Sequence, residues 1–357
     1  MEPVASYRLV KIIIRLSLAM SLLAGHVFHP AHAAQADVAQ PSLEQGTLLL
    51  KQGDLKGAEE AAKKAIQQQP SSAEAHHLLG LIYFKERKPN EAVEAFTHAL
   101  KLKPAYADAL NDLAEVYIVQ GKYTEAEQAL KRAIEVNPKH GESYLELGKL
   151  YERRGDLEGA KKLYLALLAA VPGQQDGLFE LAALYDFQGE TKAARDTLRR
   201  LTKANPKHAN AWYLNGRIAE RNNDLVEAAY AYKQAIAAKP DLVDAHYNLG
   251  FIYRSQGRPN DAEREFLEVL RYRPEYAEAH MNLGVVYTSV SKLEDAEHEY
   301  ETAVSLKPDY AEAHYNLGVF YELHRKDMGR ALAQYRKYRE LGGRDDRVER
   351  IVGSTFR

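Results

Sequence analysis

Two successive stretches decide the fold of this chain because they repeat one pattern. Residues 243–276 read VDAHYNLGFIYRSQGRPNDAEREFLEVLRYRPEY, and residues 277–310 read AEAHMNLGVVYTSVSKLEDAEHEYETAVSLKPDY. Glycine, tyrosine, alanine and proline stand at matching places in both. Because a repeat array builds one continuous core from stacked units, such a pattern overrides the usual estimate of domain number from chain length.

The same step of 34 residues extends over most of the chain. It is marked by prolines at Pro70, Pro104, Pro138, Pro172, Pro206, Pro240, Pro274 and Pro308, and by tyrosines at Tyr83, Tyr117, Tyr151, Tyr185, Tyr253, Tyr287 and Tyr321. Small residues keep the step at Gly46, Gly80, Gly148, Gly216, Gly250, Gly284 and Gly318, and at Ala58, Ala92, Ala126, Ala160, Ala194, Ala228, Ala262 and Ala296.

Each repeat contains two stretches with helical apolar periodicity, such as 245–255 and 260–272. Between them we expect a left-handed turn residue, namely Gly53, Gly121, Gly155, Gly189, Gly257 or, in the sixth repeat, Asn223. The periodic proline ends each second helix. Small residues of the Gly80 and Ala92 type let the two helices approach closely, and Tyr83 and Phe96 fill the space beside them.

These residues resemble the tetratricopeptide repeat family, whose signature appears in His246, Leu249, Gly250, Tyr253, Ala262, Phe266 and Pro274. The resemblance covers residues 39–343 as nine repeats. It implies an all-α fold, a right-handed αα-superhelix of stacked helix pairs. The ninth repeat carries one inserted residue near 324–327, and we expect residues 344–357 to form a capping helix and tail.

Composition narrows the functional classes. The 357 residues carry 48 bases and 50 acids, a net charge of −2, which gives no indication of nucleic-acid binding. Cysteine is absent, which excludes disulfides, thiol catalysis and thiolate metal sites. No nucleophile elbow, phosphate loop or zinc motif occurs, so we predict a protein that is not an enzyme and needs no cofactor or metal.

The N-terminal residues 1–33 read as a secretory signal. Three bases precede an apolar run from Leu16 to Ala24, and small residues follow at Ala31 and Ala33. Cleavage after Ala33 or after Ala36 would remove three bases and one acid and leave 45 against 49. We therefore expect an exported, periplasmic protein with a short linker at 34–38. The alternative is an uncleaved inner-membrane anchor with the repeats outside the cytoplasm.

The resemblance implies a concave groove lined by the first helices, with the second, fifth, sixth, ninth, twelfth and thirteenth places of each repeat facing inward. In repeats three to five these places are mostly acidic and include Asp112, Glu115, Glu146 and Glu180. Such a surface would attract a basic segment. The alternative is that acids in the first turn, such as Asp108, Glu142 and Asp176, merely favour the helix dipole.

In repeats seven to nine the sixth places are Asn248, Asn282 and Asn316, each preceded by Tyr247, Met281 or Tyr315. This row is similar to the asparagine ladder of the repeats in nucleocytoplasmic sugar-transferring enzymes, which implies pairing with an extended peptide backbone. The alternative is that asparagine is simply common at this place. Arg217, Arg221 and Arg254 also face inward by this map, where we expect pairing with Glu220 or Asp186.

Four histidines, His76, His246, His280 and His314, occupy the fourth place of their repeats, where we expect packing between helices. Two functional hypotheses follow. The first is an adaptor that binds an extended peptide or partner subunit in the groove. The second is a structural subunit of an envelope assembly, such as a pilus, exopolysaccharide or secretion machine, that uses the convex face and edges. The sequence leaves the partner and the oligomeric state open.

Overall fold

The computed structural model describes residues 30–354, with side chains over residues 39–353, and in this range the chain is all-α with no strand. Its elements are α2 (Pro30–Gln52), α3 (Leu55–Gln68), α4 (Ala73–Lys85), α5 (Pro89–Leu102), α6 (Ala107–Val119), α7 (Tyr123–Val136), α8 (Gly141–Arg153), α9 (Leu157–Ala170), α10 (Gln175–Phe187), α11 (Thr191–Ala204), α12 (Ala209–Arg221), α13 (Leu225–Ala238), α14 (Val243–Ser255), α15 (Pro259–Tyr272), α16 (Ala277–Ser289), α17 (Leu293–Leu306), α18 (Ala311–Phe320), η1 (Tyr321–Arg325), α19 (Met328–Glu340) and α20 (Asp346–Ser354).

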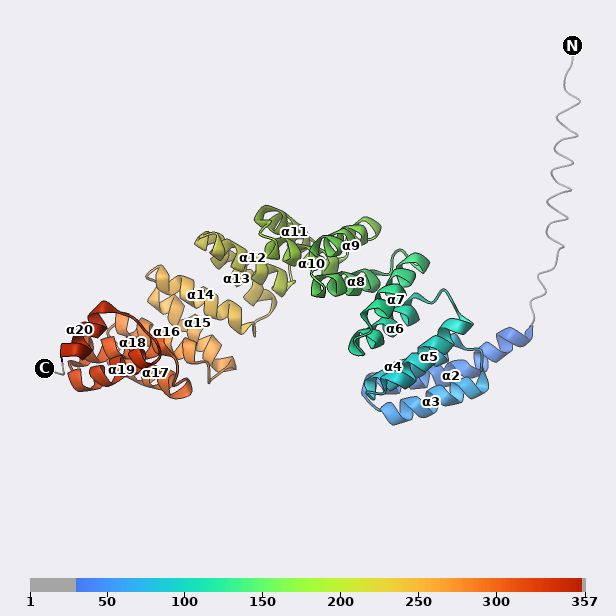
Figure 1. Cartoon of the computed structure of the whole chain (residues 1–357), viewed down its shortest axis with the longest axis horizontal. Helices are drawn as coiled ribbons and strands as arrows, with labels where there is room; N and C mark the ends of the chain where they lie inside the picture. The colour runs from blue at the N-terminus through green and yellow to red at the C-terminus, as the bar shows by residue number, and fades with distance from the viewer. Residues whose placement is uncertain (1–29, 355–357) are drawn as a thin grey trace, which may run out of the picture. The chain divides into compact units, whose positions relative to one another are not determined.

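The helices form successive pairs, each a first helix followed by a second helix that packs against it, as α4 and α5 or α12 and α13 do (Figure 1). The predicted all-α fold of stacked helix pairs is confirmed. The chain divides into a first unit, residues 1–150, and a second unit, residues 151–357. Among residues 30–354, no helix has the length and apolar character needed to cross a membrane.

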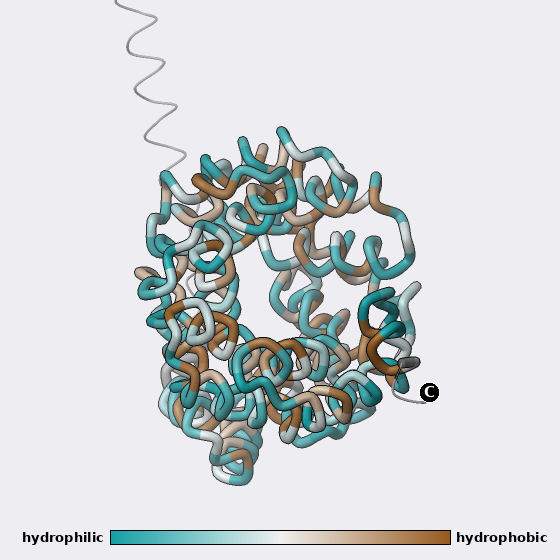
Figure 2. Tube along the Cα trace, turned by 90° about the vertical axis from the view of Figure 1, so that its left-hand side faces the viewer, coloured by the Kyte–Doolittle hydropathy of each residue, from teal (hydrophilic) through white to brown (hydrophobic). Residues whose placement is uncertain are grey.

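The core of each pair forms where a ring on the second helix lies against a glycine on the first. A Cβ atom on Gly80 would lie 2.6 Å from Phe96, and one on Gly250 would lie 2.9 Å from Phe266. Both rings are fully buried, and so is Ala92. Apolar positions accordingly recur along each helix between polar ones (Figure 2). The small residues of the repeat therefore set the distance between paired helices.

Turns and prolines fix where the helices end. Helices α5 and α15 end at Leu102 and Tyr272, two residues before Pro104 and Pro274. Gly257 and Asn223 have the expected positive φ, 66° and 59°. Three further turn residues have a positive φ that was not predicted from the sequence, because their side chains disfavour this conformation. They are Arg87, Ser291 and Lys326.

Both ends of the array depart from its regular pattern. Helix α2 includes residues 34–38, so the expected linker is helical, which suits its alanine-rich sequence. Most of the predicted signal segment, residues 1–29, lies outside the described residues. The inserted residue of the ninth repeat is accommodated by the π-helical segment η1, which ends at Arg325 and is followed by Lys326 as its C-cap. Val348 and Val352 of α20 are buried in one core cluster with Tyr335.

Candidate functional site

The first-helix face, meaning the exposed side of the first helices in each unit, is held together by a recurring contact. The fifth-place side chain of one repeat meets the sixth-place side chain of the next. Asp112 Oδ2 lies 2.6 Å from His77 Nε2, Asn282 Nδ2 donates to Tyr247 Oη at 3.1 Å, and Asn316 Nδ2 lies 3.5 Å from Met281 Sδ. The sixth place thus links successive repeats.

The predicted asparagine ladder is therefore interrupted at its middle residue. Asn282 is only 1% exposed, and its Nδ2 also donates to the Glu278 carbonyl at 2.7 Å. Its Oδ1 accepts a hydrogen bond from Arg254 Nη1 at 2.5 Å. Met281 is buried as well, at 2%. Neither side chain is accessible to a ligand in this conformation, so the row of asparagines is not continuous at the surface, and peptide contact along it stays a prediction.

The other four residues of this set remain at the surface. Asn248, Asn316, Tyr247 and Tyr315 are half-buried. Asn248 Nδ2 donates to Tyr232 Oη at 3.1 Å, and Asn316 Nδ2 donates to the Glu312 carbonyl at 2.9 Å. No described residue donates to Asn316 Oδ1 in a hydrogen bond that would occupy it. These four side chains present aromatic edges and amide groups to an approaching segment.

An aromatic and cationic pair that the sequence analysis did not select lies beside them. Phe251 is 40% exposed, and the Arg254 guanidinium carbon lies 4.7 Å from its ring centroid. Phe251 was not singled out in the sequence, where only charged, amide and flanking residues of the inward places were considered. Phe251 is the ninth residue of its repeat, a place that the family pattern directs inward, and this place could have identified it.

One of the two remaining inward arginines is paired as expected. Arg221 forms an ion pair with Asp186, one of the two predicted partners. Glu220, the other, instead accepts a hydrogen bond from Tyr232 Oη at 2.6 Å. Arg217 is exposed and forms no ion pair among the described residues. Arg217 therefore remains an uncommitted guanidinium group on the first-helix face of the second unit.

Most of the predicted acidic residues gather on α6 and α8 in the first unit. Partial burial raises the pKa of Glu115, and the neighbouring charges of Asp112, Glu146 and Glu142 raise it further. Lys149 Nζ lies 3.2 Å from Glu146, and His77 contacts Asp112, so part of the charge is balanced. Glu180, on α10, belongs to the second unit, so we describe it separately from this group.

The fourth-place histidines have structural roles. His246 Nε2 lies 3.0 Å from the Pro240 carbonyl, while its Nδ1 lies 2.7 Å from the Glu265 carboxylate. Both partners can accept a hydrogen bond, an arrangement that favours the protonated ring. Burial, the largest single effect, lowers the pKa of His246, but the hydrogen bonds to Glu265 and to the Pro240 carbonyl and the charges of Glu265 and Glu268 together outweigh it, so the net shift is upward. The same proline contact occurs at His76, His280, His314 and Trp212.

No group of three or more His, Asp or Glu side chains within the described part of the chain could hold a metal ion. The residues described above form a surface of side-chain contacts. Its chemistry is carboxylate in the first unit and aromatic, amide and guanidinium in the second.

Comparison with protein families identifies the repeats that carry these residues. Three family models described as tetratricopeptide or TPR repeats match the chain, one at residues 83–150, 120–178 and 219–285, a second at 43–107 and 179–243, and a third at 286–324. Together they cover residues 43–324 without a gap. The chain belongs to the tetratricopeptide repeat family. It is thus a member of a non-catalytic family whose domains bind proteins and peptides.

Solved structures show the same fold. Pseudomonas aeruginosa pilF is 24% identical, over 58% of this chain and 94% of that chain, with a TM-score of 0.50. The C-terminal part of a TPR repeat-containing protein from Cytophaga hutchinsonii is 15% identical, over 68% of this chain and 99% of that chain, with a TM-score of 0.54. No curated protein matched the chain by sequence. These similarities concern the fold alone.

Proposed function

We propose that this tetratricopeptide repeat scaffold is an adaptor that binds an extended segment of a partner protein along its first-helix faces. The observation that carries the proposal is the carboxylate group of the first unit, where Glu115 has a raised pKa beside Asp112, Glu142 and Glu146. A carboxylate whose pKa is raised by the charges of neighbouring carboxylates, in addition to its burial, lies close to them. A basic segment would relieve that repulsion.

The second unit offers a different chemistry for an extended chain. Asn248 and Asn316 bring amide groups to the surface, and an amide both donates and accepts, so it can pair with a peptide backbone of any sequence. Phe251 and Arg254 add a flat aromatic surface with a cation above it. Backbone pairing combined with a few side-chain contacts is a common mode of peptide recognition.

The first test reverses charge on the first-helix face of the first unit. The probe is a fluorescein-labelled decapeptide of alternating lysine and glycine, and the readout is fluorescence anisotropy at 50 mM salt. Glu115→Lys with Glu142→Lys should weaken binding by about tenfold, which corresponds to roughly 1.4 kcal/mol. The loss should shrink at 500 mM salt, because the Debye length falls to about 4 Å, between its values of ~10 Å at 0.1 M and ~3 Å at 1 M.

The matched control is Glu135→Lys, which makes the same kind of charge change at an exposed position on α7, a second helix of the same unit. It should bind the lysine peptide nearly as wild type does, after allowance for two units of net charge against four in the double variant. A free-energy loss in the control of half that of the double variant, or more, would mean that only net charge matters, and would refute a specific acidic face.

A second candidate function is a structural subunit of an envelope assembly that contacts its partners through the second helices. Large apolar side chains exposed there favour it, namely Leu165, Val226, Tyr230 and Leu267. Val226, at 80% exposure, is the most accessible of them. If Val226→Asp disrupts an assembly from cell envelopes while Glu115→Lys leaves it intact, this function replaces the first.

The proposal places both functions outside the cytoplasm, on the strength of the signal-like residues 1–33. Mass spectrometry of the protein from an envelope fraction should find a mature N-terminus at Ala34 or Asp37. An intact N-terminus in the membrane fraction would indicate the anchored alternative. An intact chain in the cytoplasm would refute export.

A further inference from the structure

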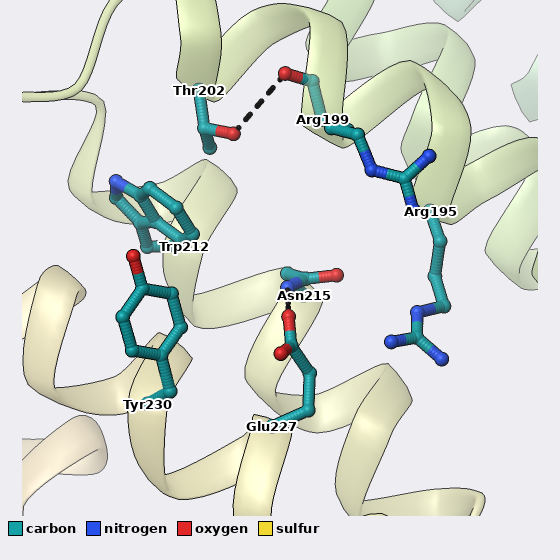
Figure 3. A pocket seen from close by; sticks show the side chains of 7 residues that line it. All are labelled: Arg195, Arg199, Thr202, Trp212, Asn215, Glu227 and Tyr230. Carbon is teal, nitrogen blue, oxygen red and sulfur yellow. Dashed lines mark hydrogen bonds between the residues drawn. The ribbon is translucent and has the colours of Figure 1, made fainter.

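A small cavity lies on the second-helix side of the second unit, away from the residues proposed above for peptide binding. Its volume is about 120 Å³, and it opens between α11, α12 and α13. Trp212 and Tyr230 form one wall, with ring centroids 5.7 Å apart, and Arg195 and Arg199 stand across from them (Figure 3). The cavity therefore combines an aromatic wall with a cationic rim.

Most polar atoms inside the cavity are already satisfied. Trp212 Nε1 donates to the Pro206 carbonyl at 3.0 Å, and Thr202 Oγ1 donates to the Leu198 carbonyl at 3.0 Å. Asn215 Nδ2 donates to Glu227 Oε1 at 3.1 Å. These contacts make the inner end of the cavity rigid and leave little for a ligand to rearrange.

One acceptor faces the cavity without a protein donor. Asn215 is 8% exposed, and no described residue donates a hydrogen bond to its Oδ1. Figure 3 shows this oxygen directed away from Glu227 into the space that faces Arg195. Among the described residues, the fully buried side-chain atoms without a partner are Glu86 Oε2 and Gln120 Oε1, so solvent reaches Asn215 Oδ1. The inner end of the cavity thus offers one accessible acceptor.

The two arginines at the rim retain free donors. Arg199 pairs with Asp196 on its own helix at 2.8 Å, but its side chain is 73% exposed. The Arg195 guanidinium reaches Asp224 only at 3.8 Å. A guanidinium group has five N–H donors, so one weak or exposed pair leaves most of them open to a carboxylate.

The helix that carries these arginines is basic as a whole. Its only acid is Asp196, whereas its bases are Lys192, Arg195, Arg199, Arg200 and Lys203. The neighbouring acids are Glu227, which lines the cavity and is bonded to Asn215, and Asp224, which lies 3.8 Å from Arg195. The five bases of α11 outnumber these two carboxylates and Asp196, so α11 keeps an excess of positive charge, which favours an acidic partner.

The size of the cavity selects the class of ligand. Pockets for small molecules and cofactors usually enclose about 300–1,000 Å³, so 120 Å³ suits a single side chain. A glutamate or aspartate side chain supplies the carboxylate for Arg195 and Arg199. The methylene groups of that side chain pack against Trp212.

We propose that this cavity docks one acidic side chain of a partner protein, presented on an acidic segment that lies along the basic face of α11. The inference does not depend on the first-helix face. It assigns a second interaction surface, of opposite charge preference, to the second-helix side of the second unit.

The experiment uses the single tryptophan of the chain, Trp212, as a reporter inside the cavity. The full-length protein is titrated with an acetylated octapeptide of alternating glutamate and glycine, and then with the same peptide in which glutamine replaces glutamate. The glutamate peptide should change Trp212 emission saturably, and the glutamine peptide should bind at least tenfold more weakly. Arg195→Gln with Arg199→Gln should lower the affinity for the glutamate peptide by at least tenfold.

The matched control is Arg264→Gln with Arg271→Gln on α15, where both arginines are exposed and pair with acids on their own helix. This variant removes the same net charge and should bind the glutamate peptide as wild type does. Far-UV circular dichroism checks that all variants are folded. Because the Arg199 side chain is largely exposed, Arg199→Gln alone provides a variant whose folding is not at risk.

Three results would overturn the proposal. The first is equal binding of the glutamate and glutamine peptides, and the second is unchanged affinity in the Arg195 and Arg199 variant. The third is a Trp212 response to phosphatidylglycerol vesicles but not to the glutamate peptide, which would assign the basic face to a membrane surface.

Discussion

Gly216→Ala tests the close packing on which the whole array depends. Gly216 on α12 faces the ring of Tyr232 on α13, and a Cβ atom there would lie 2.6 Å from one ring carbon and 2.7 Å from another. Ordinary carbon contacts begin near 3.5 Å, so the ring must retreat by about 0.9 Å. Tyr232 is fully buried, so it cannot retreat without moving its neighbours.

Two hydrogen bonds also hold the Tyr232 ring in place. Its hydroxyl donates to Glu220 at 2.6 Å and accepts from Asn248 at 3.1 Å. Overpacking a core lowers the free energy of unfolding by about 1–3 kcal/mol. For Gly216→Ala we expect a cost of ~3 kcal/mol, because the two hydrogen bonds of Tyr232 are strained as well. Alanine is a better helix former than glycine by about 1 kcal/mol, which leaves a net loss of roughly 2 kcal/mol.

The assay is urea unfolding followed by circular dichroism. Gly250→Ala should cost less than Gly216→Ala, because the Phe266 ring lies 2.9 Å from the added Cβ and has no hydroxyl to anchor it. Gly173→Ala, with no atom within 4 Å and no positive φ, is the control and should be close to neutral. In a Tyr232→Leu background, Gly216→Ala should lose most of its effect. A change below about 0.5 kcal/mol for Gly216→Ala, the usual range of surface substitutions, would refute the packing argument.

Three further predictions concern single residues. Because the pKa of His246 and of His280 is raised in the folded state by Glu265 and Glu299, their stabilisation is full below about pH 6.5 and is lost as pH rises through the folded pKa. Glu265→Gln with Glu299→Gln should therefore lower Tm more at pH 5.5 than at pH 8.5, and a difference independent of pH would contradict this. Ser291→Gly should stabilise the eighth repeat by about 0.5–1 kcal/mol in urea unfolding, because φ is 60° there and glycine removes the strain; a loss of stability would argue against a left-handed turn. Asn282→Ala should destabilise by about 1–3 kcal/mol, because it leaves Arg254 and Tyr247 without a partner, and it should leave peptide affinity per folded molecule unchanged; reduced affinity without reduced stability would restore the ladder hypothesis.

The fold was predictable because the repeat encodes packing directly. Helix ends follow from Pro104 and Pro274, and the distance between paired helices follows from glycines such as Gly80 that face a ring. The turns at Arg87 and Ser291 were missed because positive φ there is imposed by neighbouring helices and not by the residue itself. Residues 34–38 were assigned to a linker because the repeat pattern starts later, although nothing in their sequence prevents a helix.

The candidate site was less predictable because place in the repeat does not determine exposure. Asn248 and Asn282 occupy equivalent places, yet Asn282 is closed by Arg254 and Tyr247 while Asn248 stays half-buried. The carboxylates were easier to place, since charge keeps them at the surface. Trp212 was not singled out in the sequence, because the cavity that it bounds depends on Arg195 and Arg199 from the preceding repeat.

Crosslink mapping of a bound basic peptide tests the central proposal most directly. The lysine and glycine decapeptide, carrying one benzophenone group, is irradiated with the full-length protein, and adducts are located by mass spectrometry after digestion. In the first unit, the account predicts adducts on α4, α6 and residues 141–150, abolished by 500 mM salt. Adducts concentrated on the second helices α5 and α7, or spread evenly over both helices of each pair, would contradict binding on the first-helix face.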